Sequence, residues 1–231
     1  MNIAVFGATG FSGRVVVEKA LKLHDVVALV RNPTAVGHRH ERLKIVEGNV
    51  LDRQTVADVL TGCDAVIQCL GIGGKGTGKP TTFLSDATKI IVEEMQAQKI
   101  KRLIVMSNVG AGNSIAFVPW FFSRIIVPHF MKWLQMVIDD KNRMEPIVMN
   151  SGLDWTIVRC PKITDKQATG NINATLDGRG LKLSITVEDT AEFIVQQLVD
   201  DAFNKQAPSI SNYMKSSFIE TSLGTIHVVS T

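Results

Sequence analysis

The stretch Val5-Phe6-Gly7-Ala8-Thr9-Gly10-Phe11-Ser12-Gly13 decides how this chain folds. It follows the apolar run 3–6, which is typical of a buried strand, and it leads into 14–21, which has the composition of a helix. Its three glycines lie at i, i+3 and i+6, a spacing that allows a tight turn, close approach of a diphosphate and close helix packing. The first N–H groups of the helix would then point at the diphosphate. The stretch therefore predicts a dinucleotide-binding turn; the alternative is a tight turn without a ligand.

Strand and helix patterns alternate along the rest of the chain. Further strands are expected at 26–30, 43–46, 65–70, 103–106 and 155–158, and helices at 54–60, 82–98 and 132–149, the last kinked or ended early by Pro146. The region 110–129 is expected to be irregular. This alternation predicts an α/β fold with a single Rossmann-type, doubly wound parallel sheet.

Residues beyond about 160 have a different pattern, with shorter strands, an Asp177-Gly178 turn and a helix at about 187–199. We expect residues 1–212 to form one NAD(P)-binding Rossmann domain. Its part at about 160–212 would be a small C-terminal substrate-capping portion over the edge of the sheet, and 213–231 would be a tail.

In sheets of this kind, ligands bind outside the carboxyl ends of the strands. That rule selects the predicted cofactor-binding residues, which are Gly7, Thr9, Gly10, Phe11, Ser12, Gly13, Arg31, Val50, Leu51, Asp52, Leu70, Gly71 and Pro161. Thr9 and Ser12 would add hydroxyl donors. Asp52 would either accept a hydrogen bond from the adenine amino group or cap the helix that follows it.

The end of the second strand indicates which dinucleotide binds. NAD-binding sheets place an acid there for the ribose hydroxyls, whereas this chain has Val30-Arg31-Asn32-Pro33. The guanidinium of Arg31 can hold a 2′-phosphate through two hydrogen bonds, and an acid would repel it. The predicted cofactor is NADP(H) rather than NAD(H); the alternative for Arg31 is an exposed cation at a strand end.

Composition excludes several classes of function. The 231 residues carry a net charge of +3 without a dense Lys/Arg cluster, so nucleic acid is not an expected partner. The three cysteines are expected to be free thiols, and no leader precedes the first strand, so we expect a cytoplasmic protein. Because no His/Cys pair has the spacing of a zinc site, we expect no bound metal. The apolar stretch 115–131 is too short and interrupted to span a bilayer. It could lie on a membrane surface, but the sequence shows no clear basic face.

A second glycine-rich segment partly matches the sequence pattern of a phosphate-binding loop. Gly73 to Lys79 reads G-x-x-x-x-G-K, but Pro80 stands where the Mg²⁺-binding hydroxyl should be. We interpret this segment as a flexible loop over the nicotinamide end.

In combination, these motifs resemble the atypical short-chain dehydrogenase/reductases of the NAD(P)-binding, NmrA-like group, and most closely the biliverdin-IXβ reductase/flavin reductase branch. The resemblance is carried by the glycine stretch, 30–33, Gly48-Asn49-Val50-Leu51-Asp52 and Asp64-Ala65-Val66-Ile67. Later matches are Asp139-Asp140, Arg143-Met144, Ser151-Gly152-Leu153, Thr164-Asp165 and Thr175-Leu176-Asp177-Gly178-Arg179-Gly180.

This chain lacks the Tyr-x-x-x-Lys acid that most short-chain dehydrogenases use, because Val137 precedes Lys141 at that spacing and the only tyrosine is Tyr213. Carbonyl reduction needs such an acid, whereas flavins, bilins and quinones delocalise their own charge. The resemblance thus implies an NADPH-dependent oxidoreductase, like the flavin reductases, that acts on a flat aromatic acceptor. The rival hypothesis is a non-catalytic NADP(H)-binding redox sensor.

Three residues are predicted to face the chemistry: Ser107, Asn108 and Lys162. The branch commonly has serine and histidine at the last two positions, so bilin reduction is the least supported activity. Ser107 would position the nicotinamide, or else be a buried hydroxyl at a strand end. The aromatic residues Phe117, Trp120, Phe121 and Phe122 are interpreted as a hydrophobic lid or, alternatively, as core or a dimer contact, in a monomer or homodimer.

Overall fold

The apolar strand β1 (Asn2–Phe6) lies inside a parallel sheet and pairs with β2 (Asp25–Val30) on one side and β4 (Ala65–Gln68) on the other. The computed structural model describes residues 1–37, 39–72, 79–213 and 227–228. Within these residues the sheet has nine strands in the order β11-β8-β10-β6-β5-β4-β1-β2-β3. The other strands are β3 (Leu43–Glu47), β5 (Arg102–Asn108), β6 (Asp154–Cys160), β8 (Ile172–Thr175), β10 (Ser209–Asn212) and β11 (His227–Val228).

The order reverses beside β1, because chain connections run outward from β1 to β3 on one side and from β4 to β6 on the other. All pairs are parallel except β8 with β10. The predicted Rossmann-type sheet is therefore confirmed, with its switch point between β1 and β4.

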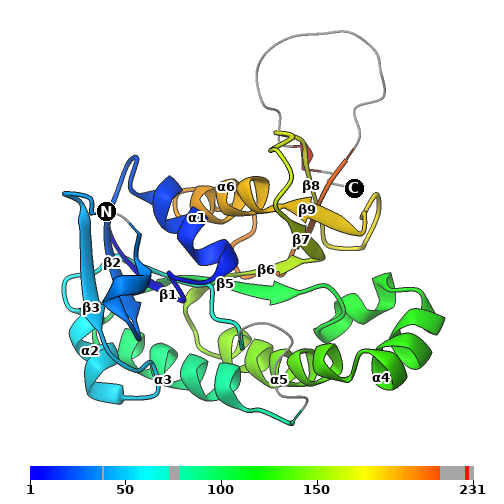
Figure 1. Cartoon of the computed structure of the whole chain (residues 1–231), viewed down its shortest axis with the longest axis horizontal. Helices are drawn as coiled ribbons and strands as arrows, with labels where there is room; N and C mark the ends of the chain where they lie inside the picture. The colour runs from blue at the N-terminus through cyan, green and yellow to red at the C-terminus, as the bar shows by residue number, and fades with distance from the viewer. Residues whose placement is uncertain (38, 73–78, 214–226, 229–231) are drawn as a thin grey trace, which may run out of the picture.

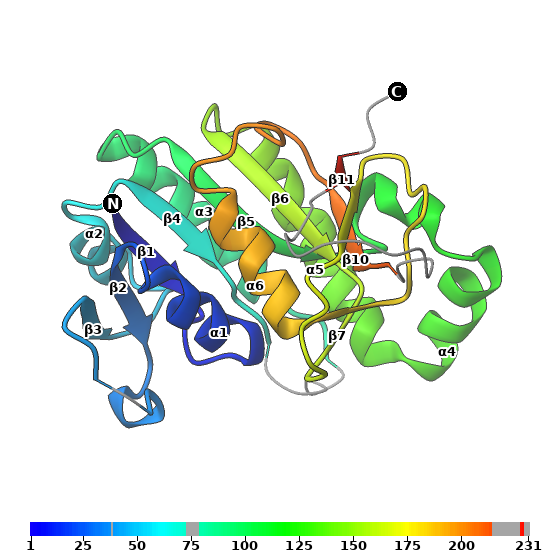
Figure 2. The same ribbon diagram turned by 90° about the horizontal axis from the view of Figure 1, so that it is seen from above.

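Helices cover both faces of the sheet (Figures 1 and 2). One face carries α1 (Phe11–Ala20) and α6 (Val187–Gln196), and the other carries α2 (Arg53–Leu60), α3 (Phe83–Ala97) and α5 (Lys132–Met149). Each face has its own buried apolar cluster. Burial on both faces explains why the central strands are continuous apolar runs rather than alternating ones.

The buried carboxylate of Asp140 joins α5 to α3. It accepts hydrogen bonds from the N–H groups of Leu84 (2.8 Å) and Ser85 (3.3 Å) and from the Ser85 hydroxyl (2.7 Å). The N-cap residue Thr82 makes no such bond with its own side chain. Asp140 thus satisfies the free N–H groups at the start of α3 from a neighbouring helix.

One expectation about the middle of the chain was wrong. The region 110–129 is not irregular but forms the 3₁₀-helix η2 (Gly112–Phe117), the π-helix η3 (Phe122–Ile126) and the start of α4 (Val127–Phe130). Pro128 stands in the first turn of α4, where its missing N–H costs no helical hydrogen bond. Of the two alternatives for Pro146, the structure excludes an early end, because α5 continues to Met149 and the Pro146 carbonyl accepts from the Asn150 N–H (3.0 Å).

The C-terminal part contributes to the main sheet and to a separate pair of strands. Helix α6 packs beside α1, and β8 and β10 extend the main sheet, while β7 (Lys162–Thr164) and β9 (Ser184–Thr186) form a separate pair. The Asp177-Gly178 turn is not a hairpin, because β8 pairs with β10 rather than β9. Instead, Gly178 lies against the ring of Phe117, and a Cβ added at Gly178 would be 2.6 Å from the ring carbons. This turn fixes the cap to η2.

Candidate active site

The turn between β1 and α1 has the geometry that the glycine pattern predicted. Gly7 has φ +86°, and a Cβ there would meet the carbonyl oxygen of Cys69 at 2.6 Å. A Cβ on Gly13 would overlap the carbonyl of Gly7, so only glycine lets α1 approach β1 this closely. The N–H of Gly10 donates to the carbonyl of Gly7 (3.0 Å) and closes the turn.

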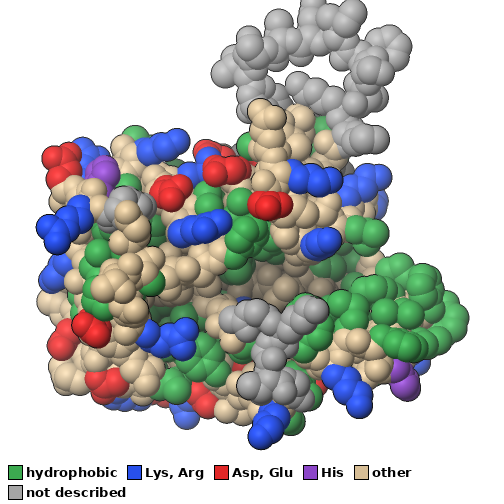
Figure 3. Space-filling model, in the orientation of Figure 1, with side chains coloured by type: hydrophobic (Ala, Val, Ile, Leu, Met, Phe, Trp, Pro, Cys, Tyr) green, Lys and Arg blue, Asp and Glu red, His purple; other side chains and the backbone are tan. Residues whose placement is uncertain are grey.

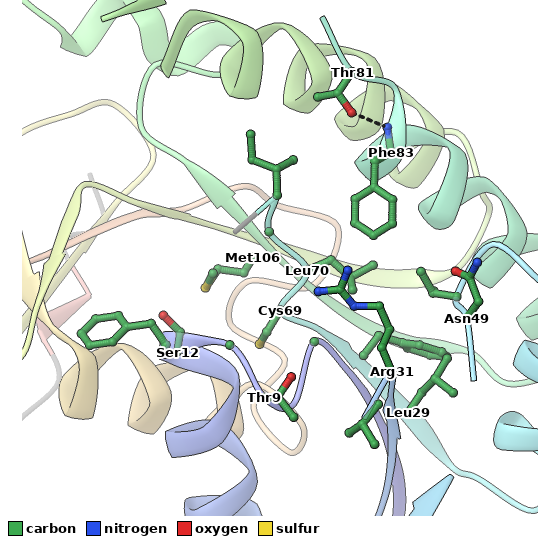
Figure 4. A pocket seen from close by; sticks show the side chains of 18 of the residues that line it. Thr9, Ser12, Leu29, Arg31, Asn49, Cys69, Leu70, Thr81, Phe83 and Met106 are labelled. Carbon is green, nitrogen blue, oxygen red and sulfur yellow. Dashed lines mark hydrogen bonds between the residues drawn. The ribbon is translucent and has the colours of Figure 1, made fainter. Parts of the chain in front are cut away.

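A pocket of about 700 Å³ opens above this turn. Nine of the predicted cofactor-binding residues line it: Gly7, Thr9, Gly10, Phe11, Ser12, Arg31, Val50, Leu70 and Gly71. Figure 4 shows that the guanidinium of Arg31 points into this space, on the opposite side from Ser12. The volume lies within the range of ligand pockets of about 300–1,000 Å³.

The remaining cofactor predictions fall outside the lining. Gly13 lies beneath the pocket, where it supports the turn. The Asp52 carboxylate caps α2 by accepting from the Thr55 N–H (3.2 Å) and hydroxyl, and the hydroxyl bond lowers the pKa of Asp52. Leu51 is exposed beside it, and Pro161 follows β6. Of the two roles considered for Asp52, the structure shows the helix cap.

Apolar side chains make up much of the remaining lining, which also includes Lys79 and Thr81, and we call the part at Met106, Trp133 and Met136 the apolar end. Met106 comes from β5, Phe83 from the start of α3, and Trp133 and Met136 from the first turns of α5. Among the described residues that line the pocket, none is Asp, Glu, His or Tyr. Sequence reasoning did not find Trp133 and Met136; their i, i+3 spacing at the start of an amphipathic helix was the available signal. The anticipated lid residues 120–122 are not among the described lining residues.

The three predicted catalytic residues do not line this pocket. Ser107 is buried, and its hydroxyl donates to Glu145 Oε1 (2.7 Å), so it is a strand-end hydroxyl held by a carboxylate. Asn108 is half-buried at the end of β5. Lys162 is exposed on β7, and its backbone N–H donates to the carbonyl of Leu183 (3.2 Å). The expectation that these side chains face one site therefore gains no support from the geometry.

A buried ion pair lies behind Ser107. The guanidinium of Arg159 donates to both carboxylate oxygens of Glu145, at 3.1 and 2.6 Å, and to Asn113 Oδ1 at 2.6 Å. Arg159 and Glu145 are 2% and 1% exposed. Because Asn113 belongs to η2, this pair anchors the segment after β5 to β6 and α5.

Lys141 is a second buried charge near the apolar end. Its Nζ donates to the carbonyl of Met106 (2.6 Å), directly behind the lining. Burial lowers the pKa of Lys141 to about 8, although Glu145 opposes that shift. Burial also raises the pKa of the free thiols of Cys69, to about 12, and of Cys160. Sulfur at these positions is therefore protonated and inert.

Comparison with known proteins shows the family of this chain. The family model for NAD(P)H-binding proteins matches residues 7–201. The chain belongs to the NAD(P)H-binding family. In sequence it is similar to the UPF0659 protein YMR090W of Saccharomyces cerevisiae, with 28% identity over 211 residues that cover 86% of this chain and 87% of the yeast protein.

Solved structures share the fold over nearly the whole chain. The oxidoreductase ylbE of Lactococcus lactis superposes with a TM-score of 0.77 at 21% identity, covering 92% of this chain and 91% of that one. ChuY of Escherichia coli O157:H7, described as an anaerobillin reductase, gives 0.74 at 20%, covering 96% and 100%. A Veillonella parvula short-chain dehydrogenase/reductase in complex with NADP gives 0.68 at 17%, covering 94% and 99%. The predicted resemblance to this NAD(P)-binding group is confirmed by the family model and by the shared fold.

The residues present fit a nicotinamide dinucleotide. The glycine turn leaves no Cβ in the space above it, the start of α1 offers N–H groups, and Arg31 supplies a cation at the far side. Among the described residues, no cluster of His, Cys, Asp and Glu could hold a metal ion. The segment 73–78, predicted to be a loop over the nicotinamide, lies outside the described residues.

Proposed function

We propose that this protein is an NADPH-dependent reductase that transfers hydride to a flavin or a similar flat, conjugated acceptor such as a quinone or bilin. One observation carries the proposal: the nucleotide cradle continues into an apolar end made by Met106, Trp133 and Met136. A hydrophobic, aromatic surface beside a nicotinamide suits an acceptor with a wide π-face.

The chain's own residues would bind and orient the reactants. The turn at Gly7–Gly13 and the first N–H groups of α1 hold the diphosphate, and Arg31 holds the 2′-phosphate. NADPH supplies the hydride. Trp133 and Met136 exclude water from the acceptor's face and hold it parallel to the nicotinamide.

The proton that completes the reduction would come from solvent. The described pocket lining offers no carboxylate, imidazole or phenol. A flavin or quinone spreads the added electron pair over its ring system, so the protein need not protonate an alkoxide during hydride transfer. A bilin acceptor gains support from the ChuY likeness.

The second candidate is a redox sensor that binds NADP(H) without turnover. The observation in its favour is that Ser107 is held by Glu145 and that Asn108 and Lys162 lie outside the pocket lining. The two functions differ in one measurement, NADPH oxidation with FMN, FAD, riboflavin and simple quinones. Oxidation above the rate without protein supports the reductase. Tight NADPH binding with no oxidation by any acceptor would refute the reductase and leave the sensor.

A further inference from the structure

Exposed apolar side chains gather on one part of the surface, around α4. Five of the thirteen large hydrophobic side chains that are exposed among the described residues lie between positions 115 and 130. We call them the apolar patch: Ile115, Trp120, Phe121, Ile125 and Phe130. Figure 3 shows hydrophobic atoms forming a continuous surface over this end of the molecule. Contiguous patches of this kind mark interaction sites, whereas single exposed apolar residues do not.

The most exposed members are large and aromatic. Phe130 and Trp120 are 76% and 69% exposed, and Trp120 packs its ring edge-to-face on Phe121 with centroids 6.4 Å apart. Trp120 and Phe121 come directly before η3 and Phe130 ends α4, and none of the three is among the described residues that line the main pocket. Trp and Phe are the side chains that enter the boundary between lipid headgroups and acyl chains.

Along the sequence, the charges beside the apolar patch have a single sign, and the first acid after it, Asp139, lines a small cavity together with Lys132. The sequence contains no Asp or Glu from residue 95 to residue 138. Arg124 and Lys132 are exposed, and neither makes an ion pair in the described part of the chain. Basic side chains at the rim of an apolar patch complement an anionic membrane surface.

The same charges disfavour a second copy of this chain as the occupant. A two-fold dimer places the same patch on both partners, so Arg124 and Lys132 of one copy would approach those of the other. The patch contains no acid that could neutralise them. A bilayer that contains anionic lipid complements both the apolar side chains and the cationic side chains of this surface.

We propose that the apolar patch is an interfacial membrane-binding surface that docks on bilayers containing anionic phospholipid. The protein would lie on the membrane and not cross it, and among the described helices none is long and apolar enough to span a bilayer. Trp120, Phe121 and Phe130 enter the headgroup boundary, while Arg124 and Lys132 contact lipid phosphates.

The test uses the full chain in flotation with vesicles of phosphatidylcholine alone or mixed with phosphatidylserine. We expect binding to the mixed vesicles, weakened about tenfold by Phe121→Ser and about fivefold by Arg124→Ser. Matched controls lie at the end of α1, where Leu23 (76% exposed) and Lys22 are a similar apolar–basic pair. Leu23→Ser and Lys22→Ser should bind like the wild type.

Three results would overturn the proposal. One is no binding to the mixed vesicles, and another is equal weakening by Phe121→Ser and Leu23→Ser. The third is a dimer that Phe121→Ser converts to monomers in sedimentation, without vesicle binding by either form, which would make the patch a self-association surface. Unchanged NADPH affinity in each variant shows that the fold is retained. None of these readouts depends on turnover, so they stand or fall separately from the proposed reductase activity.

The position of the patch suggests how an acceptor arrives, and this step rests on the proposed function. A smaller cavity of about 210 Å³ is lined by Pro128 and Lys132 and shares Thr81 and Met136 with the main pocket. A quinone dissolved in the bilayer would therefore enter beside α4. Vesicles should raise turnover of a long-chain quinone by the wild type but not by Phe121→Ser, and equal stimulation of both would exclude this route.

Discussion

Replacing Gly10 with alanine separates ligand binding from folding. The backbone of Gly10 has φ −71° and ψ 168°, which alanine adopts without strain. The added Cβ would meet only the carbonyl oxygen of Gly7, at 3.2 Å, and would otherwise project into the pocket. We expect a loss of about 1 kcal/mol in the free energy of unfolding, close to the cost of alanine at a helix N-cap.

The effect on NADPH binding should be much larger. A methyl group above the turn displaces the diphosphate from about two N–H groups of α1. Each hydrogen bond to a charged group contributes about 1.5 kcal/mol, so the loss is about 3 kcal/mol, or about 100-fold in affinity.

The assay is calorimetric titration with NADPH beside a thermal melt. Gly37→Ala is the matched control, because a Cβ at Gly37 meets nothing within 4 Å and Gly37 is not among the pocket-lining residues. An affinity of Gly10→Ala within twofold of that of the control would refute the assignment of the diphosphate to this turn.

Four further predictions follow from the site. Arg31→Ala should weaken NADPH binding about tenfold or more and leave NADH binding within about twofold, as measured by titration with each dinucleotide. Trp133→Ala should raise the Michaelis constant for FMN about tenfold without changing that for NADPH. Glu145→Gln leaves the buried guanidinium of Arg159 without a full counter-charge, so urea denaturation should show a loss of about 3 kcal/mol. Lys141 has a pKa of about 8 in the fold and 10.5 in the unfolded chain. The unfolded state therefore holds more protons between these pH values, and the free energy of unfolding of the wild type should rise with pH there relative to Lys141→Met.

Local patterns were sufficient to predict the sheet and the nucleotide end of the pocket. The strands are apolar runs because both faces of the sheet are covered. The glycine spacing predicts the turn because the backbone contacts that require glycine all lie within that one turn. Arg31 was predictable because it directly follows β2, and the carboxyl ends of neighbouring parallel strands meet at the edge of the sheet where ligands bind.

The acceptor end could not be predicted in the same way. Whether Trp133 and Met136 face the pocket depends on the rotation of α5, which is set by Asp140 docking on the start of α3 about 55 residues earlier in the chain. Ser107 is occupied by Glu145, which is 38 residues away in sequence. Contacts at such separations leave no periodic signal in the sequence.

The most direct test of the central claim is the rate of NADPH oxidation in the presence of FMN or a quinone, compared between the wild type and Tyr213→Phe. Tyr213 is the only tyrosine in the chain, so its replacement removes every phenol. If the pocket transfers hydride without a tyrosyl acid, both proteins oxidise NADPH at the same rate. Loss of oxidation in Tyr213→Phe, or no oxidation by the wild type with any acceptor, would contradict the account.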